Sequence, residues 1–274
     1  MRPRVVAIVR QVPLLMFAAL ILFPFVGVVF ATFKTNAAVY MSPFSMPHHW
    51  SLAAYVTLFQ SGQMLLYFRN SIIVSAGSIV LATVFGSMLA YGLHRMNNVW
   101  GNLLYGLVSF GIMVPPQVNM VSLYLEFDKL NLLNSLFGLV LVNTAFLIPV
   151  SVFIMGGYLK MLPPGLLEAA VVDGADEWGI FARIAMRLSG SALATIAIFA
   201  LVISWNNLLF PLLFIQSQGL QTVPLALLHF QGQYLTNYPA LFAGVIMAAA
   251  PLVILYIFLQ KYFVEGLTAG SMKG

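Results

Sequence analysis

Six stretches of mostly apolar residues, none with a formal charge in its centre, constrain this chain more than any other feature. They lie at about 12–33, 70–93, 103–124, 136–158, 190–215 and 239–260. In lipid, backbone polar groups must be paired within the protein, and a helix of about 20 residues meets that need while crossing the bilayer. With 61% hydrophobic and only 7% charged residues, the sequence predicts an all-α membrane protein with six transmembrane helices.

The basic residues between these segments predict the orientation of the chain. Nine fall on one side and three on the other. Because lysine and arginine are enriched on the cytoplasmic side of membrane proteins, the larger group marks the cytoplasm and places both termini there. The cytoplasmic group is Arg2, Arg4, Arg10, Arg95, Lys160, Arg183, Arg187, Lys261 and Lys273; the outer group is Lys34, Arg69 and Lys129.

The first segment shares one property with a secretory signal peptide, because three arginines precede its apolar run. The run from Val12 to Phe33 is longer than the typical apolar region of a signal peptide, which has about 7–15 residues. No clear small-residue cleavage pattern follows it. We therefore expect this helix to be retained.

Residue content argues against several kinds of chemistry. The chain has no cysteine, which excludes disulfides and thiolate-ligated metals. The histidines lie in loops or at span ends without ligand spacing, so we expect no metal site and no catalytic residue; they are His48, His49, His94 and His229. The net charge of +5 comes without a basic, aromatic-rich stripe for nucleic acid. No G-x-x-x-x-G-K-[ST] loop occurs, so we expect this chain not to hydrolyse ATP.

The longest cytoplasmic loop, residues 159–189, has the clearest local pattern and carries seven of the charged residues. Pro163-Pro164 favours the start of a helix, and Gly174 favours its end. Asp176 is a suitable N-cap for a second helix that continues toward Leu188. The loop is therefore predicted to form two short helices joined by a glycine turn.

The first of these helices has an apolar face on a loop that projects into water. At helical spacing, this face comprises Leu166, Leu167, Ala170 and Val171, with Glu168 and Asp173 beside it. One interpretation is that the face packs on the protein's own helix ends or lies among lipid headgroups. The other is a docking surface for a cytoplasmic partner, where each buried leucine would contribute about 1.5–3 kcal/mol. Periodicity leaves both open.

Glu168-Ala169-Ala170 followed by Gly174 resembles the EAA…G loop of ATP-binding-cassette (ABC) importer permeases. The longer run EAAVVDGADEWGIFARI is similar to its form in the carbohydrate-uptake family that includes the maltose-type permeases. Further similarities follow in order over residues 67–274: Tyr67-Phe68-Arg69-Asn70-Ser71, Ala90-Tyr91 with Arg95, Met113-Val114-Pro115-Pro116, Ser204-Trp205-Asn206 with Pro211, and the tail from Gln260 to Gly270 with Lys273-Gly274. The tail resembles that of the second permease of such pairs.

The resemblance implies a type I ABC importer permease. It implies one transmembrane domain over 1–274, with a core at about 68–260, a cytoplasmic coupling loop at 159–189 and a cytoplasmic tail at 261–274. The helix around Glu168–Asp173 would seat in a cleft of an ATPase and transmit its closure to the membrane. The implied coupling residues are Leu166, Leu167, Glu168, Ala169, Ala170, Asp173 and Gly174.

The same resemblance implies a setting and a cargo. The chain would form half of a sugar pathway, for a mono- or oligosaccharide, in a bacterial or archaeal cytoplasmic (inner) membrane. Its partners would be membrane lipid, a second homologous permease, two ATP-binding subunits and an extracytoplasmic solute-binding protein. ATP and Mg would be bound by the partner ATPase, and this chain would carry no cofactor.

Polar residues in or beside the apolar segments are candidates for the substrate pathway. They are Asn119, Ser122, Asn143, Trp205, Asn206 and Asn207. Sugars favour aromatic faces beside amides and hydroxyls, which makes the cluster at 205–207 the strongest. A buried amide often only joins two helices by a hydrogen bond worth about 0.6 kcal/mol. That alternative stays open for each residue.

Two local patterns predict where the backbone bends. Pro115-Pro116 removes two donors from the third segment and should kink or unwind it. The family usually has a Leu-Pro pair and a later proline after the loop, where this chain has Met186, Arg187 and Ser191. We therefore expect the second loop helix to enter the fifth segment with less of a break.

The outer segment 216–238 is either a contact for the binding protein or a turn packed on the bundle.

Other functional classes fit less well. A polyol or glycerol phosphate is an alternative cargo for the same kind of importer. An ion-coupled secondary transporter normally carries acidic or histidine residues within its spans, and none is centrally placed here. An intramembrane enzyme needs a base near a serine, or a metal set, at membrane depth, and the histidines lie elsewhere.

Overall fold

The computed structural model describes residues 3–60, 62–96, 98–163, 165–231 and 236–269, with side chains from residue 11 to residue 258. Arg2, Pro164, Lys273 and the end of the tail from Gly270 lie outside the described residues. The side chains of Arg4, Arg10 and Lys261 are likewise outside. Their predicted roles therefore stay predictions.

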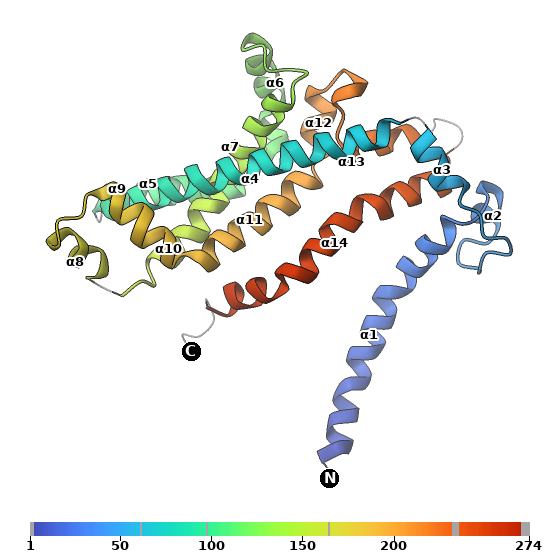
Figure 1. Ribbon diagram of the computed structural model, residues 1–274, viewed down its shortest axis with the longest axis horizontal. Coiled ribbons are helices and arrows are strands. Elements are labelled where there is room, and N and C mark those ends of the chain that lie inside the picture. Colours follow the sequence, from blue (N-terminus) through green and yellow to red (C-terminus); the bar gives the residue numbers. More distant parts are fainter. Residues whose placement is uncertain (1–2, 61, 97, 164, 232–235, 270–274) are drawn as a thin grey trace. The chain divides into compact units, whose positions relative to one another are not determined.

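Every regular element in the described part of the chain is helical (Figure 1). The α-helices are α1 (Pro3–Ala31), α2 (Asn36–Met41), α3 (Ala53–Gln60), α4 (Gln63–Met96), α5 (Val99–Phe110), α6 (Met120–Lys129), α7 (Leu136–Leu159), α8 (Leu166–Val172), α9 (Glu177–Gly179), α10 (Met186–Leu188), α11 (Gly190–Trp205), α12 (Leu209–Phe214), α13 (Val223–Leu227) and α14 (Tyr238–Ala269). Short 3-10 turns are η1 (Gly111–Met113), η2 (Pro116–Asn119), η4 (Gln218–Leu220) and η5 (Leu228–Phe230), and η3 (Ile180–Ala185) is π-helical.

Four helices in the described residues are long and apolar enough to cross a membrane, and the number rises to six if each of two bent pairs is one span. The continuous four are Gln11–Ala31, Gln63–Met96, Leu136–Leu159 and Tyr238–Phe258. The six predicted segments thus all appear as helix. The second begins earlier than expected, since α4 starts at Gln63 and includes the aromatic residues before Asn70.

The third predicted segment is broken at Pro115. Residues Val99–Met113 and Pro116–Lys129 meet at an angle of 91°. Pro115 itself is extended, with φ −64° and ψ 133°, and Pro116 begins the turn η2. Proline at this point lacks the N–H that would continue the ladder, so the predicted kink is confirmed.

The second loop helix and the fifth predicted segment, which begins at residue 190, do not form one continuous helix, so Met186, Arg187 and Ser191 do not remove the break. Glu177–Leu188 and Gly190–Trp205 meet at 79°. Ser189, with φ −84° and ψ 22°, leaves the helical region without any proline. Such a break frees backbone carbonyls, and the Tyr158 hydroxyl donates to the Leu188 carbonyl at 2.7 Å. A tyrosine on α7 therefore stabilises the bend.

The chain divides into two compact units, one made of residues 1–65 and 226–251 and the other of residues 66–225 and 252–274. In the first unit, Ala54 and Leu58 of α3 pack with Ala243 of α14. Lys34 is buried there, and its ammonium donates to the carbonyls of Ser42 and Pro43 at 2.8 and 3.2 Å. Burial lowers the pKa of Lys34.

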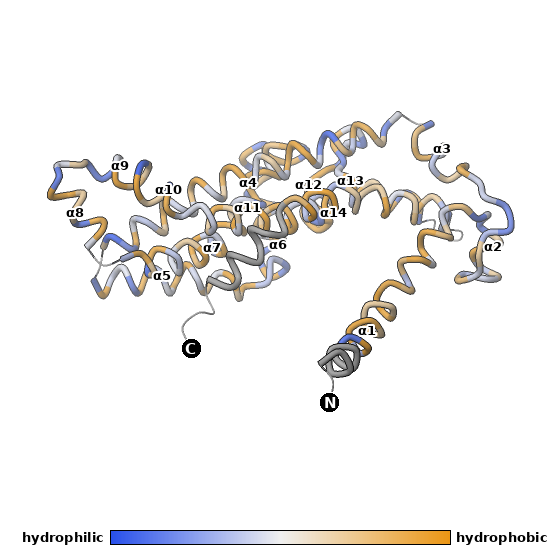
Figure 2. The backbone as a smooth tube through the Cα atoms, turned by 60° about the horizontal axis from the view of Figure 1, so that its bottom comes forward, coloured by the Kyte–Doolittle hydropathy of each residue, from blue (hydrophilic) through white to orange (hydrophobic). Residues whose placement is uncertain are grey.

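In the second unit, α7 packs against α5, α11 and α12 (Figure 1). Hydrophobic residues dominate these helices, and hydrophilic residues gather where α8 turns into α9 (Figure 2). Close approach between α4 and α7 depends on glycine, because a Cβ on Gly86 would lie 2.3 Å from the Cβ of Ser151. The unit contains the whole cytoplasmic loop and every polar residue proposed for the pathway.

The outer segment begins as a turn fastened to α4. The Asn70 amide donates to the carbonyls of Gly219 and Gln221, both at 2.9 Å, and Val223 donates its N–H to the Ser71 hydroxyl at 2.9 Å. Val223 is fully buried. This part of the segment therefore fits the packed-turn alternative.

Candidate functional site

The cytoplasmic loop folds as two short helices joined at Gly174, as predicted. Gly174 has φ +82°, a conformation open to glycine at little cost. Its N–H donates to the Val171 carbonyl and that of Ala175 donates to the Ala170 carbonyl, both at 3.0 Å. This is the Schellman pattern, which satisfies the last carbonyls of a helix.

Asp176 caps the second loop helix, also as predicted. Its carboxylate accepts a hydrogen bond from the Gly179 N–H at 3.2 Å. A Cβ at Gly179 would lie 2.7 Å from that same carboxylate oxygen, so the cap and the glycine fit together. The six residues after Gly179 form the π-helical turn η3, and π-helical turns often occur at functional sites.

The predicted apolar face of α8 is divided between the protein interior and the surface. Leu167 and Ala170 are each only 8% exposed and join a buried cluster with Ile180 and Phe181. Leu166 is half-buried, whereas Val171 is 46% exposed. The structure thus favours packing on the protein's own helices for the centre of this face.

A different set of side chains is exposed on the loop. Opposite Leu167 and Ala170, α8 presents Glu168, Ala169 and Val172, and Val172 is 87% exposed. Trp178, at the start of the second loop helix, is 61% exposed. We call Glu168, Ala169, Val171, Val172, Asp173 and Trp178 the loop surface. Val172 and Trp178 were not among the predicted coupling residues.

One ion pair fastens the loop to the end of α4. The Arg95 guanidinium donates to both carboxylate oxygens of Glu177, with Nε at 3.2 Å from each. The Tyr91 hydroxyl donates to the same carboxylate at 2.7 Å. Arg95 lowers the pKa of the Glu177 carboxyl, and the Tyr91 hydrogen bond acts in the same direction. Glu177 therefore stays ionised and holds the second loop helix against a span.

Aromatic contacts reinforce this attachment. The Phe181 ring lies 5.3 Å from that of Tyr91 and 5.4 Å from that of Trp178, measured between centroids. Phe181 is buried while Trp178 is exposed. The three rings thus connect the loop surface to α4 through one buried side chain.

Three of the predicted pathway residues lie in or beside a polar network inside the bundle. The side-chain amide of Asn207 donates from Nδ2 to Oδ1 of Asn143 at 2.8 Å, and Nδ2 of Asn143 donates to the Ser204 hydroxyl at 3.2 Å. Asn207 also accepts from the Phe210 N–H at 3.1 Å and so caps α12. Trp205 is 4% exposed, and its ring lies 6.2 Å from that of Phe68.

The other predicted pathway residues are placed differently. Asn119 and Ser122 are exposed beside the bend at Pro115, and Asn206 is exposed after the end of α11. The structure therefore does not bring the six residues together into one site. Asn143 and Asn207 fit the alternative in which an amide joins two helices.

The described residues contain no group of three or more histidine, cysteine, aspartate or glutamate side chains that could hold a metal ion. The concentrated features of the second unit are instead an exposed loop surface and buried helix-joining amides.

A family profile matches residues 82–268, which include the whole loop. It describes the inner membrane component of binding-protein-dependent transport systems. The chain belongs to this family.

Individual relatives agree. The permease is 33% identical to the probable ABC transporter permease protein YurM of Bacillus subtilis (strain 168), over 95% of this chain and 87% of that protein. It is 34% identical to the arabinooligosaccharides transport system permease protein AraQ of Halalkalibacterium halodurans, over 94% and 93%. It is 35% identical to the melibiose/raffinose/stachyose import permease protein MelC of Bacillus subtilis (strain 168), over 76% and 75%.

The fold is shared with a solved structure. A chain of a bacterial ABC transporter involved in the import of the acidic polysaccharide alginate matches with a TM-score of 0.79, covering 95% of this chain and 97% of that one at 21% identity. The chain is therefore a membrane-spanning permease subunit of the ABC carbohydrate-uptake family, with the type I importer fold, and a transport subunit.

Proposed function

We propose that this permease forms half of the translocation pathway of an ATP-driven importer for a mono- or oligosaccharide, as the second permease of a pair. The cargo is supported by relatives named for arabinooligosaccharides and for melibiose, raffinose and stachyose. The family description supports a multi-pass protein of the bacterial or archaeal inner membrane. A polyol or glycerol phosphate is the alternative cargo.

The loop surface is the proposed contact with an ATP-binding subunit. This proposal rests on one observation: the loop is held in place by contacts with the spans, yet it exposes apolar side chains. Leu167 and Ala170 anchor α8 from within, and Arg95 holds Glu177, so the loop keeps its shape. At the same time Val172 and Trp178 are exposed to water, where apolar surface is stabilised by a partner.

This arrangement suggests how ATP would drive transport. ATP and Mg bind in the ATPase, whose closure moves the loop surface. The displacement passes through the Arg95–Glu177 pair to α4 and through the bend at Ser189 to α11. Because packed helices shift as whole elements, the pathway changes from inward-facing to outward-facing.

A solute-binding protein would deliver the sugar from outside. A related permease structure, at 16% identity and a TM-score of 0.69, belongs to an alginate transporter in complex with a pentasaccharide-bound periplasmic protein. In this chain the outer turn at Gly219–Val223 is fixed to α4 by Asn70 and Ser71. The exposed residues at 216–219, just before the buried part of this turn, are the proposed contact with the binding protein.

The coupling proposal is tested by co-purification of the tagged chain with its ATPase and by ATP-dependent sugar uptake in vesicles. Val172→Asp would place a charge in the interface and is expected to weaken association by at least about tenfold, since an unpaired buried charge is costly. Trp178→Ala is expected to weaken it as well. Met161→Asp, an exposed apolar residue of the same loop outside the loop surface, is the control. Unchanged association and uptake in Val172→Asp would contradict the proposal.

A further inference from the structure

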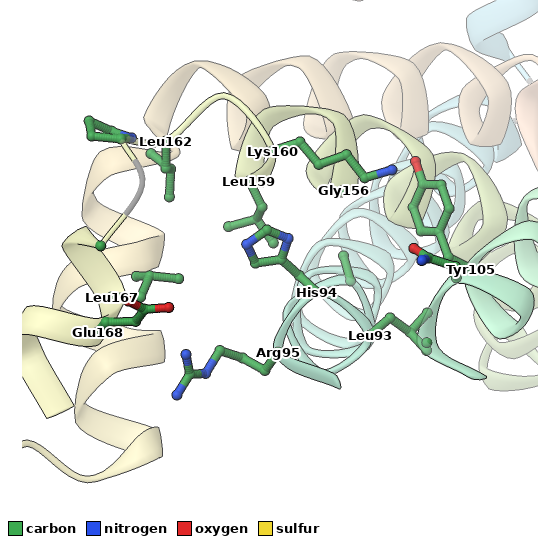
Figure 3. A pocket seen from close by; sticks show the side chains of 15 residues that line it. Leu93, His94, Arg95, Tyr105, Gly156, Leu159, Lys160, Leu162, Leu167 and Glu168 are labelled. Carbon is green, nitrogen blue, oxygen red and sulfur yellow. The ribbon is translucent and has the colours of Figure 1, made fainter. Parts of the chain in front are cut away.

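A cavity of about 370 Å³ lies where α4 and α7 end, and three basic side chains line it. His94 and Arg95 come from the last turn of α4, and Lys160 follows the end of α7 (Figure 3). Asn102 of α5 and Glu168 of α8 line other walls. The cavity therefore lies behind the loop surface, at the level where the spans end.

The position of the Lys160 ammonium is fixed by an aromatic ring. Its Nζ lies 4.4 Å from the centroid of Tyr105, a favourable distance for a cation over a π face. Tyr105 is itself held, because its ring packs on Gly156, where a Cβ would lie 2.4 Å from the ring. Among the described residues, Arg95 and Glu177 form the one ion pair, so Lys160 has no ion-pair partner there.

The charges around the cavity are unevenly distributed. His94 lies near two cations, Lys160 and Arg95. Arg95 has negative neighbours in Glu177 and Glu168, and Figure 3 shows Glu168 on the Arg95 side, away from the Lys160 ammonium. The end of the cavity at Lys160 therefore remains electropositive. An anion bound there would be attracted by the Lys160 ammonium.

The side chains next to the cavity indicate contact with lipid. Val99, Trp100 and Leu103 precede and follow the lining residues of α5 and are 81%, 67% and 57% exposed. Tryptophan is enriched at the headgroup level of membranes. An exposed tryptophan between two apolar neighbours suits a helix start that faces headgroups and acyl chains.

We propose that this cavity binds a phosphate ester anion, held by Lys160, His94 and the Asn102 amide, and that the headgroup of an anionic phospholipid supplies it. Basic pockets between helices on the cytoplasmic side are a known way to hold such headgroups. Neither the sugar pathway nor ATPase docking is needed for this binding. The lipid would sit directly behind α8, at the end of the cavity away from Glu168.

The test is native mass spectrometry of the purified full chain in detergent, titrated with phosphatidylglycerol, with phosphatidylcholine and with glycerol 1-phosphate. Removal of one charge near the membrane surface should weaken anionic lipid binding about fivefold. Lys160→Gln is therefore expected to retain phosphatidylglycerol about fivefold less well, and Lys160→Arg to retain it normally. Asn102→Asp, nearly isosteric, should weaken it similarly by adding a negative charge. Lys129→Gln removes an exposed charge on α6 outside the cavity and is the matched control.

The outcomes separate the sources of phosphate. Lysine-dependent retention of phosphatidylglycerol, undisturbed by glycerol 1-phosphate, supports the lipid. Binding of glycerol 1-phosphate as tight as that of phosphatidylglycerol, with the same dependence on Lys160, supports the phosphate site and overturns the lipid as its source. Equal retention by all variants, or equal retention of phosphatidylcholine, overturns the proposal. Because no transport is measured, this result is independent of the proposed importer function.

Discussion

Arg95, in the last turn of the second span, holds Glu177, the first residue after the cap of the second loop helix. The two side chains come from positions 82 residues apart and meet through both carboxylate oxygens. Their side chains are 28% and 59% exposed, so solvent screens the pair. An exposed ion pair contributes only about 0.2–1 kcal/mol to the stability of the fold. The main effect of this pair is therefore to fix the position of the second loop helix.

Glu177→Gln is expected to loosen the second loop helix while leaving the fold intact. Global stability should fall by less than about 1 kcal/mol, because the lost pair is exposed. Hydrogen exchange should rise over residues 177–185 and stay unchanged in α7. Asp173→Asn, an exposed carboxylate of the same loop, is the control. Equal exchange in both variants would show that the ion pair does not position the loop.

Gly174→Ala should destabilise the loop because the residue has φ +82°, although an added Cβ would meet no atom within 4 Å. The cost is therefore backbone strain alone, about 1–2 kcal/mol for an alanine in the left-handed region. Asparagine tolerates that region better, so Gly174→Asn should recover part of the loss. Thermal unfolding in detergent measures both. Identical melting temperatures for the two variants would contradict the argument.

Gly86→Ala should push α4 and α7 apart. A Cβ there would lie 2.3 Å from the Ser151 Cβ, and overpacking of this kind costs about 1–3 kcal/mol. Gly92→Ala is the matched control on the same helix, since nothing lies within 4 Å of its added Cβ. We expect a lower melting temperature only for Gly86→Ala. Equal effects would mean that the two helices adjust freely.

The amide pair Asn143 and Asn207 is suited to a double-mutant cycle. Alanine at either position should lose the hydrogen bond between them, and the coupling energy is expected near 0.6 kcal/mol, with an upper value of about 1.7 kcal/mol for such bonds in membranes. The coupling energy is obtained from the unfolding free energies of the unmodified protein, the two single variants and the double variant. If the variants instead raise the sugar concentration needed for half-maximal uptake without changing stability, the residues belong to the substrate pathway.

The spans and two of their features were predictable because their signals are local. Length and apolarity identify a membrane helix, and Pro115-Pro116 marks a break wherever it occurs. Gly174 and Asp176 act on their own backbone neighbourhood, so the loop's turn and cap also followed from residue type. The break at Ser189 did not, because it depends on a tyrosine from another helix that satisfies the Leu188 carbonyl.

The rotation of α8 was not predictable for a different reason. Six of its seven residues are apolar, so helical spacing offers several apolar faces of similar quality. Contact with Ile180 and Phe181, which lie in the π-helical turn, selects Leu167 and Ala170 as the inner side. Likewise Glu177 is one of two adjacent acidic residues, and only the position of Arg95 shows which of them forms the ion pair.

The hydrogen bond between Asn143 and Asn207 also bears on how the protein is made. The two residues are 64 positions apart, so the fourth apolar segment is synthesised well before its partner. Until the later segment arrives, the Asn143 amide lacks both bonds it makes in the finished bundle. An unpaired amide disfavours stable residence in lipid. The two polar partners of Asn143 therefore become available only after the fifth apolar segment has been synthesised.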